Sequence, residues 1–294
     1  MSDFATLEEA FKGNADNMRL RALKRLSSLT KRNTIAYYSG FLTPGPVRNG
    51  FEISDLDINA FMNMAHGMDR SRGLNLILHT PGGGIAATEQ IVTYLRSLFD
   101  GDIVCFVPQI AMSAGTMIAC SCKSIFMGRQ SCLGPIDPQY LGCPCHGVIE
   151  EFERAVDRIK KDITELHLWR PIIEKYNPTF LGECQKAIEL SKELVGQWLA
   201  TGMFKNEEDP QKKAEEVAGR LADHSRTKTH NRHISAEVAK SLGLHIEMLE
   251  DQQNLQDAVL AVHHCFMLSF MHSPLIKIVQ AQNGKRFLIS ATAG

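Results

Sequence analysis

Residues 76–90 read LILHTPGGGIAATEQ, and residues 107–121 read VPQIAMSAGTMIACS. Each stretch begins with a short apolar run that is typical of a buried strand, and then passes through small residues into a segment with helical spacing. The first junction holds three glycines, and the second holds Ser113. Two strand–turn–helix units in succession predict a layered α/β fold with parallel strands joined by right-handed crossovers.

The segments around these two stretches continue the alternation of strand and helix. Apolar and β-branched runs predict strands at residues 33–41, 74–80, 102–108 and 124–128. Helical spacing of apolar residues predicts helices at residues 54–71, 85–99 and 113–122. The first half of the chain is therefore expected to form an α/β domain.

The flanking regions are mainly helical. Residues 1–32 are predicted to form an N-terminal helical segment, and residues 33–294 a single domain. Within that domain, a helical insertion is predicted at about residues 147–222, projecting from the sheet and packing on it or on another subunit. A further amphipathic helix is predicted over residues 255–280, with a closing strand at 285–290.

Composition limits the partners and the compartment. The chain has 294 residues, of which 44% are hydrophobic and 22% charged, so it can bury a substantial core. Its net charge of −1 argues against nucleic acid and anionic membranes as partners. It shows neither an apolar signal segment nor a continuous apolar span, so we expect a cytoplasmic protein with no membrane span.

Eight cysteines are scattered along the chain, and they are expected to be reduced thiols. Residues 120–122 read CSC and residues 143–146 read CPCH, so a single residue separates the cysteines of each pair. Structural zinc sites place two to four residues between paired ligands. We therefore expect no metal and no cofactor, and His263 and His264 are interpreted as core or interface histidines.

The two junctions carry the candidate chemistry. Gly82, Gly83 and Gly84 permit a left-handed backbone and let bare N–H groups approach a negatively charged oxygen. Acyl transfer requires such donors beside a nucleophile, which Ser113 could supply. Two alternatives stay open. The glycines could cradle a phosphate, although this turn matches neither GxxxxGK[ST] nor GxGxxG, and Ser113 could simply cap a helix.

Four stretches together resemble the serine dehydrogenase proteinase family: LILHTPGGGIAATEQIVTYLR, VPQIAMSAGTMIA, MGRQSCLGPIDPQ and THNRHISAEVAKSLGL. That family belongs to the Clp protease/crotonase superfamily, together with signal peptide peptidase A, and the resemblance runs from about residue 30 to residue 285. It implies a spiral of ββα units with additional helical arms that build oligomers. It also implies Ser113 as the nucleophile and the backbone N–H groups of Gly83 and Ala114 as an oxyanion hole.

The resemblance leaves the general base open, because Clp proteases use histidine and aspartate whereas signal peptide peptidase A uses lysine. Where Clp proteases have the histidine, this chain has Ile136 and Asp137, and Asn231 stands where they have the aspartate. The remaining candidates are His230, His146, and Lys161 or its neighbour Lys160. His146 could merely begin a helix, the lysines could be solvated charges, and the absence of a competent base is the last alternative.

The expected function is that of an ATP-independent serine endopeptidase, a homo-oligomer that hydrolyses peptide or unfolded protein substrates through an acyl-enzyme on Ser113. A crotonase-like acyl-CoA enzyme would use the same glycine loop without the serine, but the sequence shows no basic cluster dedicated to the CoA phosphates. The third alternative is a catalytically silent or regulated scaffold, which the residues Asn231 and Asp137 keep open.

Overall fold

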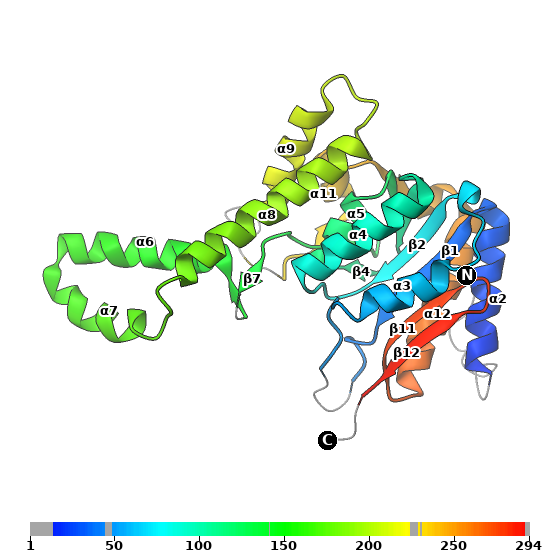
Figure 1. Ribbon diagram of the computed structural model, residues 1–294, viewed down its shortest axis with the longest axis horizontal. Coiled ribbons are helices and arrows are strands. Elements are labelled where there is room, and N and C mark those ends of the chain that lie inside the picture. Colours follow the sequence, from blue (N-terminus) through cyan, green and yellow to red (C-terminus); the bar gives the residue numbers. More distant parts are fainter. Residues whose placement is uncertain (1–13, 45–48, 141, 224–228, 230, 292–294) are drawn as a thin grey trace.

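Seven strands form the central sheet in the order β10-β5-β3-β2-β1-β11-β12 (Figure 1). The computed structural model describes residues 14–44, 49–140, 142–223, 229 and 231–291. Five strands run parallel: β1 (Asn33–Ser39), β2 (Leu74–His79), β3 (Ile103–Val107), β5 (Ser124–Met127) and β10 (Ile246–Met248). β11 (Leu275–Ala281) and β12 (Arg286–Ser290) complete the sheet in antiparallel pairing. The predicted α/β class with a mostly parallel sheet is thus confirmed.

Helices cover both faces of this sheet because its central strands are apolar on both sides. Ile35, Leu76 and Cys105 share one face with α3 (Asp57–Ala65), α4 (Ile85–Phe99), α5 (Ala114–Cys120) and the inner part of α8 (Phe180–Thr201). Their neighbours Ala36, Ile77 and Phe106 point to the other face, which is covered by α2 (Ala15–Thr30) and α12 (Gln253–Met271). The pleat therefore divides the core into two layers, one on each side of the sheet.

Two small sheets extend the central one near the candidate site. β4 (Ile110–Ala111) pairs in parallel with β6 (Cys132–Leu133), and β9 (Ile234–Ser235) pairs with β6 in antiparallel fashion. β7 (Gln139–Tyr140) and β8 (Cys143–Pro144) form a hairpin. The segment that follows β9 forms the short helix α11 (Ala236–Ser241), and the Ser235 side chain caps it by accepting from Val238 N–H. Strands β4, β6 and β9 thereby join three distant parts of the sequence.

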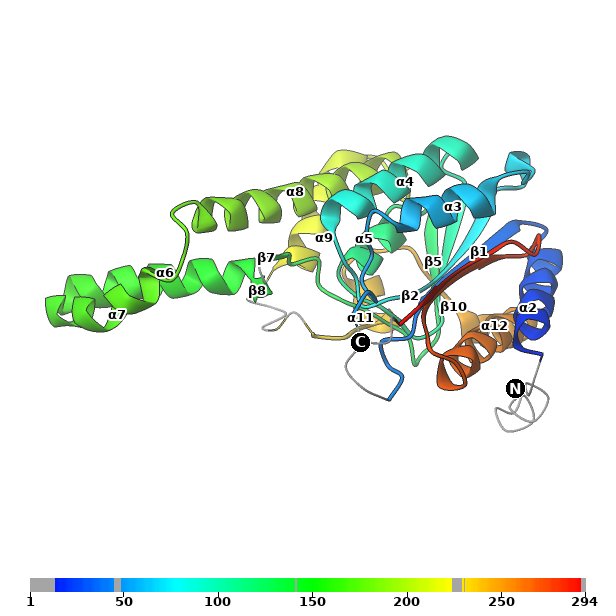
Figure 2. The ribbon, with the colours of Figure 1, turned by 60° about the horizontal axis from the view of Figure 1, so that its bottom comes forward.

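A helical arm projects from the body of the molecule (Figures 1 and 2). We use this name for α6 (Cys145–Lys161), the 3-10 turn Ile163–Glu165 and α7 (Leu166–Ile173). The outer part of α8 (Phe180–Thr201) packs along α6, and its inner part packs against α9 (Pro210–Ala222). Ile163 is 69% exposed and Leu168 is 65% exposed, so the arm carries apolar side chains that this chain does not cover.

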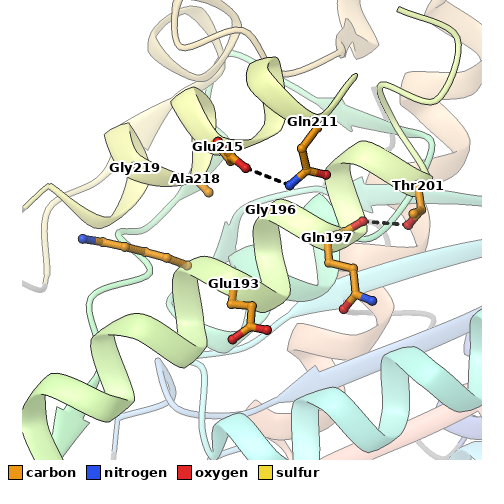
Figure 3. Close-up of a pocket in the computed structure, with 9 residues that line it drawn as sticks. Glu193, Gly196, Gln197, Thr201, Gln211, Glu215, Ala218 and Gly219 are labelled. Atoms are coloured by element: carbon orange, nitrogen blue, oxygen red, sulfur yellow. Dashed lines mark hydrogen bonds between the residues drawn. The ribbon is translucent and has the colours of Figure 1, made fainter. Parts of the chain in front are cut away.

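A groove of about 530 Å³ runs between α8 and α9 (Figure 3). Glu193, Gly196 and Gln197 line it from α8, and Gln211 and Glu215 line it from α9. Gln211 donates a hydrogen bond of 2.9 Å to Glu215, so both polar side chains of the α9 wall are paired with each other. No residue of the PGGG loop or of the Ser113 turn lines this groove.

The predicted helix over residues 255–280 is wrong in its second half. Helix α12 ends at Met271, and Leu275–Ala281 forms strand β11 in the central sheet. Pro274 explains the break, because a proline disfavours helical backbone in the residue before it and lacks the N–H that a helix needs. The β-branched residues that follow pair with β1. The helix expected at 54–71 is also shorter, since α3 ends at Ala65.

The N-terminal helical segment is described from residue 14 onward, and its earlier part lies outside the described residues. Within the described part, α2 packs against α12. Arg19 is buried there and donates to Gln280 at 2.7 Å. The division of the chain at residue 32 stays a prediction. In the part of the chain that the structure describes, no helix is both long and apolar enough to cross a membrane.

Candidate active site

Two strand–helix turns meet at one edge of the sheet. The first joins β2 to α4 through residues 80–84, and the second joins β4 to α5 through residues 112–113. Backbone hydrogen bonds tie them together: Thr80 N–H donates to Ile110 at 3.1 Å, and Met112 N–H donates to Thr80 at 3.0 Å. The glycine loop and Ser113 are therefore neighbours, as their positions at consecutive parallel strands predict.

Gly82 lies directly against the serine turn. Its φ is +106°, a conformation that side chains rarely adopt. A Cβ atom at Gly82 would lie 2.8 Å from the Met112 carbonyl oxygen, 2.8 Å from Ser113 Cβ and 3.2 Å from the Ala114 nitrogen. Only glycine fits here, because every one of these neighbours is backbone or the root of a side chain.

Gly83 and Gly84 are fixed by a second strand-like contact with Ile53. Ile53 N–H donates to Gly82 at 2.7 Å, and Gly84 N–H donates to Ile53 at 2.9 Å. A Cβ atom at Gly83 would lie 2.2 Å from the Ile53 nitrogen. The loop is thus held from one side by Ile53 and from the other by the Ser113 turn.

Ser113 occupies a strained backbone conformation, with φ of 50° and ψ of −115°. It precedes α5, but its side chain makes no capping hydrogen bond, so the interpretation as a helix-capping serine is wrong. A residue in this region costs about 1–3 kcal/mol, and such strain persists where the surrounding structure imposes it. The turn leaves the Ser113 side chain partly exposed at the carboxyl end of the strands.

The glycine loop and the Ser113 turn each hold a backbone N–H group without a partner among the described residues. Among the described residues, neither the Gly83 N–H nor the Ala114 N–H has an intramolecular hydrogen bond, whereas Gly115 N–H donates to Met112 at 2.7 Å. Ala114 is the first residue of α5 and adjoins the Gly82 backbone. Acyl transfer uses backbone N–H groups of this kind, without intramolecular partners, to bind an oxygen that gains negative charge.

The buried side chain of His79 links the segments that lead into the two turns. The neutral His79 ring donates from Nδ1 to the Ser39 carbonyl, with 3.1 Å between the atoms, and Nε2 lies 3.0 Å from the side-chain amide of Gln109. His79 is in the strand that leads to the glycine loop, and Gln109 precedes Ser113 by four residues. Burial lowers the pKa of His79 to about 4, against the opposing effect of its hydrogen bonds.

Acid should destabilise the fold through His79. In the unfolded chain the ring protonates near pH 6.5, whereas in the folded chain it stays neutral down to about pH 4. The unfolded state therefore binds the extra proton first, and stability that is complete above pH 6.5 is lost as the pH falls to 4. The loss amounts to roughly 3 kcal/mol. Urea unfolding measured across this pH range gives the slope of the unfolding free energy against pH.

The matched variants for this experiment are His79→Gln and His233→Gln. Glutamine at position 79 cannot titrate, so the slope of unfolding free energy against pH should become shallower between pH 6.5 and 4. His233 is exposed, and its replacement should leave the slope unchanged. Equal slopes for wild type and His79→Gln would show that His79 does not cause the loss of stability in acid.

Of the candidate bases, His146 lies beside a buried carboxylate. His146 Nε2 is 3.9 Å from Asp137 Oδ1, and the two side chains are 23% and 1% exposed. Asp137 belongs to the segment that begins at Gly134, whose N–H donates to Thr116 of α5 at 2.9 Å. Cys145 N–H, at the start of α6, donates to Pro138 at 3.0 Å. Asp137 and His146 therefore stand on a segment anchored to the helix that follows Ser113.

Sequence reasoning missed this pairing. The sequence identifies His146 as a candidate base and Asp137 only as the residue that stands where Clp proteases have histidine, so it does not connect the two. The two are brought together because the β7–β8 hairpin reverses the chain between them. A carboxylate and a histidine nine residues apart, with turn residues between, are the signal that the sequence offered.

The other candidate bases are placed differently. Lys160 and Lys161 end α6, which has 17 residues, so Lys161 lies about 24 Å along the helix axis from Cys145. His230 lies outside the described residues. Asn231 is exposed and precedes β9, which pairs with β6 at Leu133. The segment of Asn231 thus runs toward the strand that leads to Asp137.

The cysteines are mostly buried thiols. All eight cysteines are free, and seven are buried. Burial raises the pKa of Cys145 to about 12, and its contact with Cys184 acts in the same direction. Within the described ranges, no group of three or more histidine, cysteine, aspartate or glutamate side chains is arranged to hold a metal ion.

A mostly parallel sheet covered on both faces, a small sheet beside two strand–helix turns and a helical arm define a Clp protease-like α/β protein. The family described as ClpP-like SDH-type serine proteinase matches residues 51–285. The match covers most of the chain, and the chain belongs to this family. The suspected family is thereby confirmed.

Two uncharacterized proteins of Methanocaldococcus jannaschii are similar to the chain. One is 28% identical over 173 residues, which make up 59% of this chain and 51% of that protein. The other is 27% identical over 248 residues, which make up 78% of this chain and 73% of that protein. The chain therefore spans about half the length of the first relative and about three quarters of the second.

Proposed function

We propose that the chain is a serine endopeptidase whose nucleophile is Ser113. The observation that carries the proposal is the strained Ser113 backbone, with φ of 50°, which makes no capping hydrogen bond and packs directly against Gly82. The hydroxyl attacks a peptide carbonyl, the amine leaves, and water hydrolyses the resulting ester. Membership in a family of ClpP-like serine proteinases supports this chemistry.

The oxyanion of the tetrahedral intermediate binds to the N–H groups of Gly83 and Ala114. This assignment is supported by the free state of the donors, because neither N–H group makes an intramolecular hydrogen bond among the described residues. The contact of Gly82 with Ser113 and Ala114 supports a common site for the nucleophile and the donors. Fixed donors of this kind contribute about two to three powers of ten in rate each.

His146 accepts the proton from Ser113, and Asp137 orients its ring. The distance of 3.9 Å between His146 Nε2 and Asp137 Oδ1 supports this pair, as does the near-complete burial of Asp137. A histidine oriented by a carboxylate is a common partner of nucleophilic serine. The position of Lys161 at the distal end of α6 argues against a lysine base from the same chain.

The nucleophile can be tested without knowing the substrate. The full chain is incubated with a fluorophosphonate, which reacts with activated serines, and the labelled residue is identified by mass spectrometry. The same preparation is then incubated with a mixed peptide library, and its cleavage products are mapped. We expect the label on Ser113 and cleavage that the label abolishes. A folded protein that neither takes the label at Ser113 nor cleaves any peptide would overturn the proposal.

The base is tested by a pair of variants on the same helix. His146→Gln should lower the rate of peptide cleavage by about two to four powers of ten, because a general base contributes that much. Lys161→Gln should leave the rate unchanged, since its side chain is at the other end of α6. Loss of activity in Lys161→Gln together with full activity in His146→Gln would reverse the assignment.

The arm supports a homo-oligomer as the active form. Val156, Ile163, Leu168 and Ile172 are exposed apolar side chains on α6, α7 and the turn between them. Exposed apolar side chains gathered on a projecting element are typical of surfaces buried by association. Another copy of the chain is the partner that we propose for this arm.

A further inference from the structure

A cavity of about 620 Å³ opens on the face of the central sheet that α2 and α12 cover. Arg32 and Lys123 mark its position, because they directly precede strands β1 and β5. The cavity therefore lies toward the amino ends of the parallel strands, whereas Ser113 follows their carboxyl ends. No residue of the candidate active site lines it. Its volume is that of a pocket for a small organic molecule.

The floor of the cavity is apolar and aromatic, with one amide. Asn75 pairs with Val104 and Phe106 pairs with Phe126 in the parallel register, so these four side chains share one face of the sheet. The rings of Phe106 and Phe126 are stacked, with 4.8 Å between centroids and 17° between planes. Aromatic pairs in this arrangement offer a flat surface on which a further ring can pack.

Asn75 is the polar exception on this floor. It is 1% exposed, and its Nδ2 donates to Thr30 Oγ1 at 2.7 Å and to Thr34 Oγ1 at 3.3 Å. Its Oδ1 is buried and has no hydrogen-bond partner among the described residues. Thr30 cannot supply the missing proton, because its hydroxyl donates to Leu26. A buried acceptor without a donor is unfavourable, so this oxygen favours a ligand that carries an N–H or O–H group.

The rim of the cavity is positively charged. Arg32 and Lys123 are the charged residues that line it within the described part of the chain. Both contact the carboxylate of Asp102, so two cations share one anion. Residues 252–255 form another wall and include the first turn of α12, a helix of 19 residues whose N-cap residue, Gln252, makes no side-chain capping bond. The uncapped amino end of a helix attracts negative charge.

We propose that this cavity binds a small aromatic anion. The ring of the ligand lies against Phe106 and Phe126, its negatively charged group faces Lys123 and the amino end of α12, and its N–H group donates to Asn75 Oδ1. This ligand site is separate from the Ser113 turn, and it does not depend on the proposed peptidase activity.

The probe that matches all three features is indole-3-acetate, titrated into the full chain by isothermal calorimetry. We expect saturable binding of one molecule per chain. Two probes each lack one feature: 1-naphthaleneacetate has no N–H group, and 3-methylindole has no negative charge. Each should bind about three- to tenfold more weakly than indole-3-acetate, since each loses one polar interaction.

The variants assign the binding to this cavity. Lys123→Gln should weaken indole-3-acetate by about fivefold or more and leave 3-methylindole unchanged, because only the charge is removed. Lys123 is 45% exposed, so its replacement leaves the core intact. Phe126→Leu should weaken all three probes. Lys285→Gln, a lysine that does not line the cavity, is the control and should bind like wild type.

Two results would overturn the proposal. One is the absence of binding by any of the three probes at millimolar concentration to a chain that circular dichroism shows to be folded. The other is binding of indole-3-acetate that neither Lys123→Gln nor Phe126→Leu weakens, because the ligand would then occupy a different place.

Discussion

Replacing Ser113 by alanine should reduce peptide cleavage by about four to six powers of ten, because the attacking oxygen is removed and only binding and the backbone donors remain. The measurement is kcat/KM on the best peptide from the library. Ser121→Ala is the matched control: Ser121 ends the same short helix, and its hydroxyl donates to Ile118. It should retain near-normal activity.

The same position provides a second readout through stability. Ser113 has a φ of 50°, and alanine would suffer the same strain whereas glycine would not. Ser113→Gly should therefore be as inactive as Ser113→Ala but more stable by about 1 kcal/mol in urea unfolding. Full activity in both variants would contradict the catalytic role, and equal stability of the two would contradict the strain.

Removing the buried cation Lys277 should cost about 3–5 kcal/mol of unfolding free energy, because Asp57 would be left buried without its counter-ion. Lys277 Nζ lies 2.9 Å from Asp57 Oδ2, and the two side chains are 2% and 0% exposed. Tyr37 also donates to this carboxylate, at 2.9 Å. Lys277→Met keeps the length of the side chain, and urea unfolding at neutral pH measures the loss.

A second substitution separates the lost charge from the lost packing. The double variant Asp57→Asn with Lys277→Met should regain part of the stability, because no charge then remains buried. Arg170→Gln breaks an exposed ion pair with Glu174 on α7 and should change stability little. A single Lys277→Met variant as stable as wild type would show that the buried pair contributes nothing.

The regular elements could be predicted because their signals are local. Helix α4 runs from Ile85 to Phe99, as its apolar spacing predicts, and the apolar runs before the two turns form β2 and β3. The wrong helix prediction at residues 275–281 also has a local cause, because the apolar spacing continues past Pro274 although the helix does not. Where a strand follows a helix after only three residues, as β11 follows α12, the proline between them is the signal and the apolar periodicity is not.

The candidate site could be predicted only in part. Gly82 and Ser113 come together because they follow neighbouring parallel strands, and the sequence shows that order. The contact of Asp137 with His146 depends on a hairpin of two-residue strands, which composition does not reveal. The pair of Asp57 and Lys277 joins residues that are 220 positions apart, so no local pattern indicates it.

Helix α6 joins the residue proposed as the base to the arm proposed as the assembly surface. His146 is its second residue, while its distal turn lies about 24 Å further along the helix axis. The helix is stiff, so a tilt imposed at the distal end turns the first residues as well. In the assembly proposed above, a second copy that binds the arm would therefore also set the direction of the proposed base, His146. Assembly would then control proton transfer, and a chain that has not assembled would be inactive.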